Sequence, residues 1–504
     1  MLAVAPAAVA APAETVLYSF SGSNGDGASP NAGLTADSAG NFYGTTVYGG
    51  ASSFGTVFKV TPSGSETVLY SFTGGSDGSN PNGGLIADGA GNLYGTATFG
   101  GASGAGTVFR LSPSGVLTVL HSFAWSDGAF PYARLLADNA GNLYGTTVNG
   151  GGASCGTVFK LAPDGTMTVL YSFACSADGG APYGGLIADS AGNLYGTTSG
   201  GGASSAGTVF KLTPSGTETV LYSFSGSPDG ASPHAGLTAD SAGNFYGTTV
   251  HGGMSNAGTV FKLAPGGTES VLYSFTCGTD GANPNAALLM DSAGSLYGTS
   301  PGGCAASNGT VFKVTAGATT VLYSFAGGAD GAIPYAPLIA DGAGNLYGTT
   351  YSGGASFVGT VFKLADAGFV TTPPSVLFGA FKAVLGIEFG KKSNADAFQL
   401  VSSFTLGQGS NGINPLGEPV TLRVGTFATT IPPGSLKGRN SGPFYFVGAL
   451  NGVDLQVVIV PRGLNQYQFI AAAEKTSLIG TANPVSVALT IGDDTGTVSV
   501  NAVH

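Results

Sequence analysis

The sequence has few charged side chains, and this shortage argues against one class of partner. Asp, Glu, Lys and Arg together make up 9% of the 504 residues, against roughly 25% in an average soluble domain. Residues 14–367 contain 20 acidic and 8 basic side chains, whereas residues 370–504 contain 7 and 8. Because nucleic acid is a polyanion, the acidic first part predicts that the protein binds no nucleic acid.

Long apolar runs are missing as well. No apolar segment reaches the roughly 18 residues of a membrane span, so we expect no transmembrane segment. Residues 1–13, "MLAVAPAAVAAPA", are small and apolar and end in A-x-A patterns, which are typical of the back half of a secretory signal peptide. The basic start of such a signal is absent from this stretch, and a disordered Ala/Pro leader is the alternative.

Glycine and self-similarity are what the sequence has in excess. Gly supplies 87 residues, and the phrases "YGT", "GTVFK" and "SF" each recur seven times, some with variants, at spacings of 50 to 52 residues. Within residues 184–224, four runs rich in β-branched and aromatic residues, "GLIAD", "NLYGTT", "GTVFKL" and "TETVLYSF", alternate with turn residues. Four antiparallel strands per unit, repeated seven times, predict an all-β, seven-bladed β-propeller.

The order of the strands predicts how the propeller closes. The chain begins with a lone fourth strand at 14–20, and the array ends with the first three strands of a unit at 336–364. Seven complete blades form only if these segments join, and joining them also removes exposed sheet edges. An open, superhelical β-array is the alternative. We therefore expect a propeller over 14–367 and a linker over 368–375.

The repeated blocks resemble a known family. "ADSAGNLYGTT", "GTVFKLTPSG" and "TETVLYSF" look like the GloVer-type tandem repeat of secreted bacterial choice-of-anchor proteins, and the resemblance covers residues 14–364. It implies export and a secreted or cell-surface location, and it brings no established activity.

Fourteen of the 27 acidic residues occupy two repeated positions. Those of the first set lie in D-x-A-G-[NS] turns, where we expect the carboxylate to accept backbone N–H bonds. Those of the second set precede Gly in the loop that enters the next unit, and one acid per loop is too few for a calcium cage. We expect neither a resident metal nor a cofactor, with ions shared by a ring of loops as the alternative. The first set is Asp37, Asp88, Asp138, Asp189, Asp240, Asp291 and Asp341; the second is Asp26, Asp77, Asp127, Asp178, Asp229, Asp280 and Asp330.

Positions that vary between units are the candidates for a binding site. The residue after the loop proline should lie at the mouth of the central channel, and seventeen residues later the end of the second strand also varies. We expect each such couple to face across one hairpin, where aromatic, amide and imidazole groups suit a neutral polar ligand such as a glycan. Ordinary loop variation is the alternative. The first positions are Asn31, Asn82, Tyr132, Tyr183, His234, Asn285 and Tyr335; the second are Tyr48, Phe99, Asn149, Gly200, His251, Gly302 and Ser352.

The third unit departs furthest from the repeat. It carries the single Trp of the chain, Trp125, together with Phe130, Tyr132 and Arg134. Arg134 occupies a position that is Gly, Ala or Pro in every other unit, so we predict a cation at the channel wall beside an aromatic cluster. His234 shares the fifth unit with a second imidazole, but two imidazoles without a third ligand are a weak metal signal.

The four cysteines fall in two neighbouring couples. Cys155 precedes a third strand and Cys175 follows the fourth strand of the same unit, while Cys277 and Cys304 lie in loops that flank the sixth unit. We predict the pairs 155–175 and 277–304, although four cysteines allow three connectivities. Disulfides would fit an oxidising compartment, and free buried thiols are the alternative.

The repeat stops after residue 375 and the pattern changes. "AFKAVLGIEF" alternates apolar and other residues like a half-buried strand, and Asn451-Gly452 separates two strand-like runs, which is a strong hairpin signal. About eight strands predict an antiparallel β-sandwich over 376–504. The segment "GSNGINPLGEPVTLRVGTFATTIPPGS" resembles an accessory β-sandwich domain of secreted bacterial proteins, and this resemblance brings no activity. We expect the domain to serve in adhesion, or in docking to the cell surface or to the propeller.

Three classes of function remain, of which pure surface-layer assembly is the least favoured. The favoured one is an extracellular binding or structural scaffold whose propeller face recognises a glycan or protein; the alternative is a secreted polysaccharide hydrolase or lyase. Propeller enzymes need a non-repeated cluster of acid–base groups near the axis, and the sequence places none there, so we name no catalytic residue. The oligomeric state cannot be read from the sequence. The non-repeated acids are Glu14, Glu66, Asp164, Glu218, Glu269 and Asp366, near the third-to-fourth-strand turns, fourth-strand starts or the end of the array.

Overall fold

The computed structural model divides the chain into two compact units, Met1–Thr371 and Thr372–His504. The prediction of an all-β protein is confirmed, because every helix or strand assigned to the described residues is a strand. Within these residues, no helix is long and apolar enough to cross a membrane. The described residues are 12–302, 308–315, 318–371, 376–377, 380–388, 396–405, 419–424, 426–432, 434–438, 443–450, 453–463, 466–476, 485–491 and 494–500.

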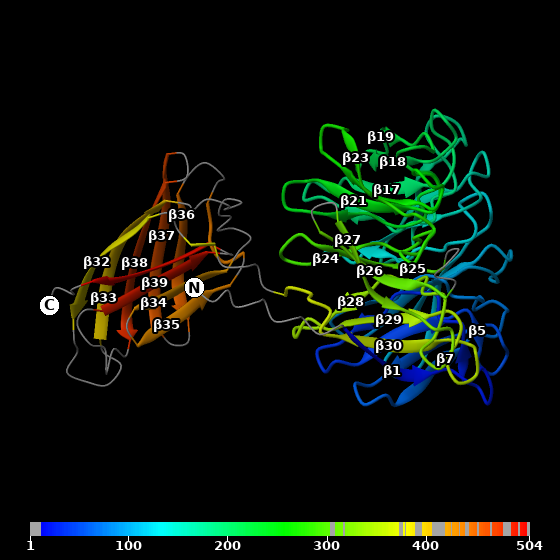
Figure 1. The fold of residues 1–504 in the computed structure, drawn as a ribbon, viewed down its shortest axis with the longest axis horizontal. Helices are drawn as coiled ribbons and strands as arrows, with labels where there is room; N and C mark the ends of the chain where they lie inside the picture. Colours follow the sequence, from blue (N-terminus) through cyan, green and yellow to red (C-terminus); the bar gives the residue numbers. More distant parts are fainter. Residues whose placement is uncertain are drawn as a thin grey trace, which may run out of the picture. The chain divides into compact units, whose positions relative to one another are not determined.

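The first unit is built from four-stranded antiparallel sheets, of which the described residues form seven (Figure 1). Six of these sheets follow one another along the chain. The first two consist of β3 (Thr35–Ala36), β4 (Phe42–Thr46), β6 (Thr56–Val60) and β7 (Glu66–Ser71), then β8 (Ile86–Ala87), β9 (Leu93–Ala97), β10 (Thr107–Leu111) and β11 (Leu117–Ser122). The next two are β12 (Leu136–Ala137), β13 (Leu143–Thr147), β14 (Thr157–Leu161) and β15 (Met167–Ser172), then β16 (Ile187–Ala188), β17 (Leu194–Thr198), β18 (Thr208–Leu212) and β19 (Glu218–Ser223). The fifth and sixth are β20 (Thr238–Ala239), β21 (Phe245–Thr249), β22 (Thr259–Leu263) and β23 (Glu269–Ser274), then β24 (Leu289–Met290), β25 (Leu296–Ser300), β26 (Thr310–Thr315) and β27 (Ala318–Ser324).

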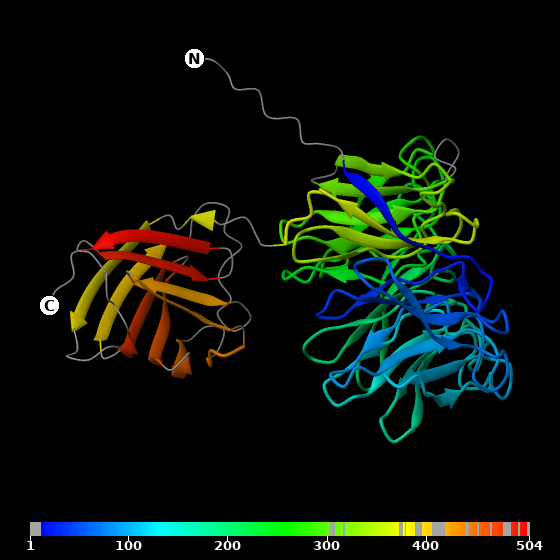
Figure 2. The same cartoon turned by 90° about the horizontal axis from the view of Figure 1, so that it is seen from below.

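The seventh sheet combines the two ends of the repeat array. Its strands are β28 (Ile339–Ala340), β29 (Leu346–Thr350), β30 (Thr360–Ala365) and β1 (Ala13–Ser19). The N-terminal strand pairs antiparallel with β30, and Thr15 lies opposite Lys363. Figures 1 and 2 both show the blue β1 beside the yellow strands that end the array. Segments almost 350 residues apart in the sequence thus share one sheet.

Buried phenylalanines connect each sheet to the next. The Phe after each fourth strand packs edge-on against the Phe in the third strand of the following sheet, with ring centroids 5.0–5.3 Å apart. The same contact joins the sixth sheet to the seventh and the seventh to the first. Such edge-to-face pairs stabilise the packing beyond the area they bury. The pairs are Phe72–Phe109, Phe123–Phe159, Phe173–Phe210, Phe224–Phe261, Phe275–Phe312, Phe325–Phe362 and Phe20–Phe58.

The repeated aspartates hold turns and loops, as predicted. Asp37 accepts the backbone N–H of Ala39 and Asn41 at Oδ1, and the Asn41 amide and the Tyr43 hydroxyl at Oδ2. Asp26 of the second set accepts the backbone N–H of the loop that it closes and a tyrosine hydroxyl. These bonds occupy the carboxylates in protein contacts, which accounts for their repetition.

The segment that follows β30 docks on the sixth sheet. Phe369 packs against Tyr297 with ring centroids 5.1 Å apart, the Tyr297 hydroxyl donates to the Gly368 carbonyl at 2.6 Å, and Val370 N lies 3.5 Å from Asp291 Oδ2. The start of the predicted linker therefore contacts the first unit. In the other six turns an Asn side chain donates to this carboxylate oxygen, whereas the sixth turn has Ser295 in its place.

The second unit contains two five-stranded sheets over one apolar core, within the residues that the structure describes. Side chains such as Leu400 and Phe469 from one sheet meet Leu422 and Val487 from the other. β36 and β37 form the predicted hairpin, with Leu450 opposite Val453. The first sheet is β31 (Val376–Leu377), β40 (Asp494–Val500), β39 (Val485–Ile491), β34 (Val420–Val424) and β35 (Phe427–Ile431). The second is β32 (Ala380–Glu388), β33 (Asp396–Thr405), β38 (Gln466–Thr476), β37 (Val453–Gly463) and β36 (Phe444–Leu450).

One strand pair corrects the prediction for this unit. β31 runs parallel to β40, so the two-sheet unit is not wholly antiparallel. Parallel neighbours need a long connection, and here the rest of the unit lies between the two strands. β31 has only two residues, too few to show a period in the sequence.

Candidate functional site

One cavity is lined by residues of all seven repeats, and we call it the channel. It encloses about 510 Å³, and its wall is made by the residues that run from the loop proline into each first strand. We call the seven residues after the prolines the mouth residues. All seven line the channel, so the predicted site residues of this set lie together: Asn31, Asn82, Tyr132, Tyr183, His234, Asn285 and Tyr335.

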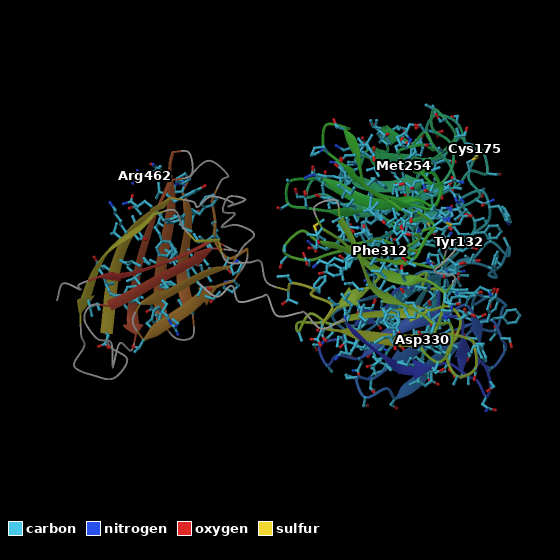
Figure 3. The ribbon with its side chains drawn as sticks, in the orientation of Figure 1. Tyr132, Cys175, Met254, Phe312, Asp330 and Arg462 are labelled. Atoms are coloured by element: carbon cyan, nitrogen blue, oxygen red, sulfur yellow. A yellow bond between two sulfur atoms is a disulfide. The ribbon has the colours of Figure 1, made fainter. Side chains whose placement is uncertain are left out.

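Neighbouring mouth residues contact one another. The Asn31 amide donates to Asn82 Oδ1 at 3.0 Å. On the other side, the Tyr183 ring lies 5.4 Å from that of Tyr132 and stacks on His234 at 4.6 Å, and His234 Nδ1 lies 3.0 Å from Asn285 Oδ1. These contacts hold four neighbouring side chains, Tyr132, Tyr183, His234 and Asn285, in one polar and aromatic row. Figure 3 labels Tyr132.

Burial favours the neutral forms of two mouth residues, His234 and Tyr132. Desolvation, with a smaller contribution from the nearby His251, lowers the pKa of His234 below its ordinary value. Desolvation, followed by the charges of Tyr183 and Tyr48, raises the pKa of Tyr132. At neutral pH the row therefore offers uncharged imidazole, phenol and amide groups.

A shallower depression of about 350 Å³ adjoins the mouth. It shares five mouth residues and adds aromatic side chains, of which Tyr48 is 47% and Phe99 39% exposed. Tyr351 also lines it and was not among the predicted residues; its signal in the sequence is a Tyr where the first, third and fifth repeats have Val. Exposed aromatic faces beside amides suit stacking and hydrogen bonding together. The lining residues are Asn31, Val47, Tyr48, Asn80, Asn82, Phe99, Tyr132, Asn285, Tyr335 and Tyr351.

The predicted couples do not face each other across a hairpin. Tyr48 pairs with Ala28 in the short ladder of β2 (Gly27–Ala28) and β5 (Tyr48–Gly49), three residues before its expected partner Asn31. Ser29 adopts a φ of 55°, which turns the chain before the proline and shifts the register. The couple of the first repeat still lies in one depression, because both residues line it.

The aromatic cluster of the third unit lies beside the channel. Phe130 packs edge-on against Trp125 at 5.1 Å and against Phe99 at 5.0 Å. Neither Trp125 nor Phe130 lines the channel, and Trp125 is 44% exposed. Phe99 also lines the depression, so the cluster extends the aromatic surface outward from it.

Arg134 lines the channel as predicted. Its Nε donates to the Leu85 carbonyl of the neighbouring repeat at 3.1 Å, and its stem passes over Gly84. The side chain is exposed at the channel wall, and the protein around it lowers the pKa of Arg134 by desolvation. Arginine nevertheless remains protonated in proteins.

The two histidines have separate partners. His234 contacts Tyr183 and Asn285, whereas His251 Nδ1 lies 3.4 Å from the Asn283 amide. In the part of the chain that the structure describes, no group of three His, Cys, Asp or Glu side chains is placed to hold a metal ion.

Cys155 and Cys175 form a disulfide, as predicted, and Figure 3 labels Cys175. Cys277 is also disulfide-bonded. Its predicted partner Cys304 lies outside the described residues. The bond between Cys155 and Cys175 fits an oxidising compartment.

Comparison with known families identifies the repeat. The sequence matches the Gloeobacter/Verrucomicrobia repeat over residues 7–202 and again over 183–377. The chain belongs to this family. The second unit lies almost entirely beyond the matched residues of this Gloeobacter/Verrucomicrobia repeat protein. No curated protein matches the chain.

Solved structures give remote likenesses. A gluconolactonase from Xanthomonas campestris shares 15% identity over 62% of this chain and 89% of its own, with a TM-score of 0.39. A protein assigned as a 6-phosphogluconolactonase from Bacteroides uniformis shares 18% identity over 65% of this chain and 91% of its own, with a TM-score of 0.45. A Trypanosoma rangeli sialidase shares 9% identity over 93% of this chain and 97% of its own, with a TM-score of 0.33. At such scores these likenesses carry no conclusion about activity.

Proposed function

We propose that residues 14–367 form a closed seven-bladed β-propeller whose channel mouth binds a glycan or protein ligand outside the cell. Closure is supported by the pairing of β1 with β30 and by the contact of Phe20 with Phe58. A third contact between the ends of the array is the hydrogen bond from Thr349 Oγ1 to the Ala32 carbonyl at 3.3 Å.

The remaining assignments complete this proposal. Residues 1–13 are a signal-peptide remnant or leader, 368–375 a linker, and 376–504 an accessory β-sandwich that attaches the protein or contacts a partner. The Cys155–Cys175 disulfide supports a secreted or cell-surface location. The docking of Phe369 on Tyr297 holds the first residues of this segment, 368–370, against the sixth sheet.

The observation that carries ligand binding is the composition of the mouth. All seven repeats present a side chain there, and in the four from Tyr132 to Asn285 neighbouring side chains stack or hydrogen-bond in one row. The adjoining depression adds exposed aromatic faces at Tyr48 and Phe99. Aromatic faces and neutral amides together match the apolar faces and hydroxyl groups of sugars.

Binding is favoured over hydrolysis by the chemistry of the wall. Glycoside hydrolysis uses two carboxylates that flank the scissile bond. The residues lining the channel and the depression, all of them described, carry amide, phenol, imidazole and guanidinium groups and no carboxylate. The repeated acids of the entering loops, such as Asp26, are engaged by loop backbone and tyrosine hydroxyl groups.

A glycan array with matched variants tests this proposal. Tyr183→Ala removes the ring between Tyr132 and His234, and loss of one stacking aromatic should weaken a bound sugar by about tenfold. Phe54→Ala is the control, because Phe54 is also an exposed aromatic residue but lines neither the channel nor the depression. Binding that survives Tyr183→Ala would contradict the mouth as the binding site, and a wild type that binds no array ligand would contradict a glycan as its ligand.

A further inference from the structure

One charged side chain, that of Arg134, lines the channel, and no described residue of opposite charge lines it. Arg134 is the one Arg, Lys, Asp or Glu among the residues that line it, and all of these residues are described. Its Nε bonds to Leu85, while Nη1 and Nη2 make no hydrogen bond to the described residues. A guanidinium group has five N–H donors in a planar fork, so four of the donors of Arg134 are open to a ligand.

The repeat makes room for this side chain. The equivalent position is Gly in four of the other units, so small residues surround the arginine at its own level of the channel. A Cβ atom at Gly84 would lie 3.5 Å from Arg134 Cδ, which shows that the stem rests directly on that glycine. The four glycines are Gly33, Gly84, Gly185 and Gly236.

Apolar groups form much of the surrounding wall. The channel wall includes the apolar residues that lie two positions after Arg134 or its equivalent in four repeats: Leu136, Ile187, Leu289 and Ile339. Arg134 is exposed at this wall, so an anion in the channel can reach its guanidinium, and the apolar wall reduces the screening of the charge relative to bulk water. The planar fork matches a carboxylate in a bidentate pair better than it matches a neutral hydroxyl group.

We infer that the ligand of the channel is an acidic sugar, a hexuronic acid unit whose carboxylate pairs with Arg134 while its ring contacts the mouth residues. This inference rests on the proposed function and narrows its ligand class. Tyr132 precedes Arg134 by two residues in the same repeat, so the aromatic contact and the cation come from adjacent positions on one side of the channel.

Binding of trigalacturonate and of triguluronate, each compared with its own methyl ester, tests the inference by calorimetry on the full chain. The wild type should bind at least one of the two acids. The ester of that trisaccharide should bind about tenfold or more weakly, because esterification removes the charged acceptor of the paired hydrogen bonds from Arg134. Arg134→Gly should reduce binding of the acid to the level of the ester. This variant restores the residue of four other repeats, and an unchanged melting temperature shows that it folds.

Arg110→Lys is the matched control. Arg110 lies in β10 at a position where the other six repeats have Lys, and it does not line the channel. This variant should bind the acid like the wild type.

Three results overturn the inference. In the first, neither acid binds the wild type. In the second, acid and ester bind equally and Arg134→Gly changes neither. A neutral ligand whose binding falls with Tyr183→Ala but not with Arg134→Gly would also reject the acidic sugar and would leave the proposed function standing.

Discussion

Stability should respond to pH through carboxyl groups buried between sheets. The side chain of Glu66, at the start of β7, has an Oε1 atom that is buried and makes no hydrogen bond to the described residues. Burial, followed by the charge of Asp26 on the preceding loop, raises the pKa of Glu66 from 4.5 to about 7. Glu14, Glu218 and Glu269 have the same environment and the same raised pKa.

The sign follows from proton binding. Between pH 4.5 and about 7 the folded protein holds a proton at Glu66 that the unfolded chain has released. The free energy of unfolding therefore falls as pH rises through this range and stays lower above it. A fully buried carboxyl with this pKa would lose about 3 kcal/mol. Because Glu66 is only half-buried, solvent screening reduces the loss, and we expect about 1 kcal/mol.

Glu66→Gln should therefore stabilise the protein by about 1 kcal/mol at pH 8 and have little effect at pH 4.5. Glu66→Met is a second variant that the scaffold already accommodates. β15, the fourth strand of the third sheet, begins with Met167 where β7 begins with Glu66. Urea unfolding followed by circular dichroism at the two pH values measures the difference. Equal effects of Glu66→Gln at both pH values would refute the reasoning, as would destabilisation at pH 8 by both variants.

Three further outcomes are expected. The Cys155–Cys175 bond closes a loop with a sequence separation of 20 residues, so Cys175→Ser should cost about 3 kcal/mol in urea unfolding; no loss relative to the wild type would contradict this. Ser295→Asn should compete with Val370 for the turn carboxylate, so limited proteolysis after residue 370 should accelerate, and Ser295→Ala should not have this effect. Phe58→Ala removes a fully buried ring and should cost about 3–5 kcal/mol; a cost below about 1 kcal/mol, typical of a surface position, would contradict its place in the core.

The repetitive features were predictable because each is written seven times. Strand phrases, the turn role of Asp37 and its equivalents, and the proximity of Cys155 to Cys175 follow from spacing within one unit. The mouth positions followed from variation at a fixed place after the proline. The location of each mouth residue could be predicted. The stacking of Tyr183 on His234 could not, because it depends on the rotation of neighbouring sheets relative to each other.

Other features depend on single departures whose partners lie far away in the chain. Ser295 stands where the other six repeats have Asn. Only the structure shows that the backbone N–H of Val370 takes the place of the Asn side chain at the Asp291 carboxylate. The shift that pairs Tyr48 with Ala28 arises from a positive φ at Ser29, a residue type with no strong signal for it. The parallel pairing of β31 is too short to leave a pattern in the sequence.

Closure of the propeller is the central claim, and a designed cross-link tests it most directly. Thr15 and Lys363 are register partners, and opposite residues in antiparallel strands lie about 4.5–5.5 Å apart at Cα, within the span of a disulfide. Lys313 occupies the same position in the sixth sheet and serves as the mismatched partner. Peptide mapping after mild oxidation should find the 15–363 bond in Thr15→Cys/Lys363→Cys and no 15–313 bond in Thr15→Cys/Lys313→Cys. Absence of the first bond, or formation of both with equal yield, would contradict a propeller closed by its N-terminal strand.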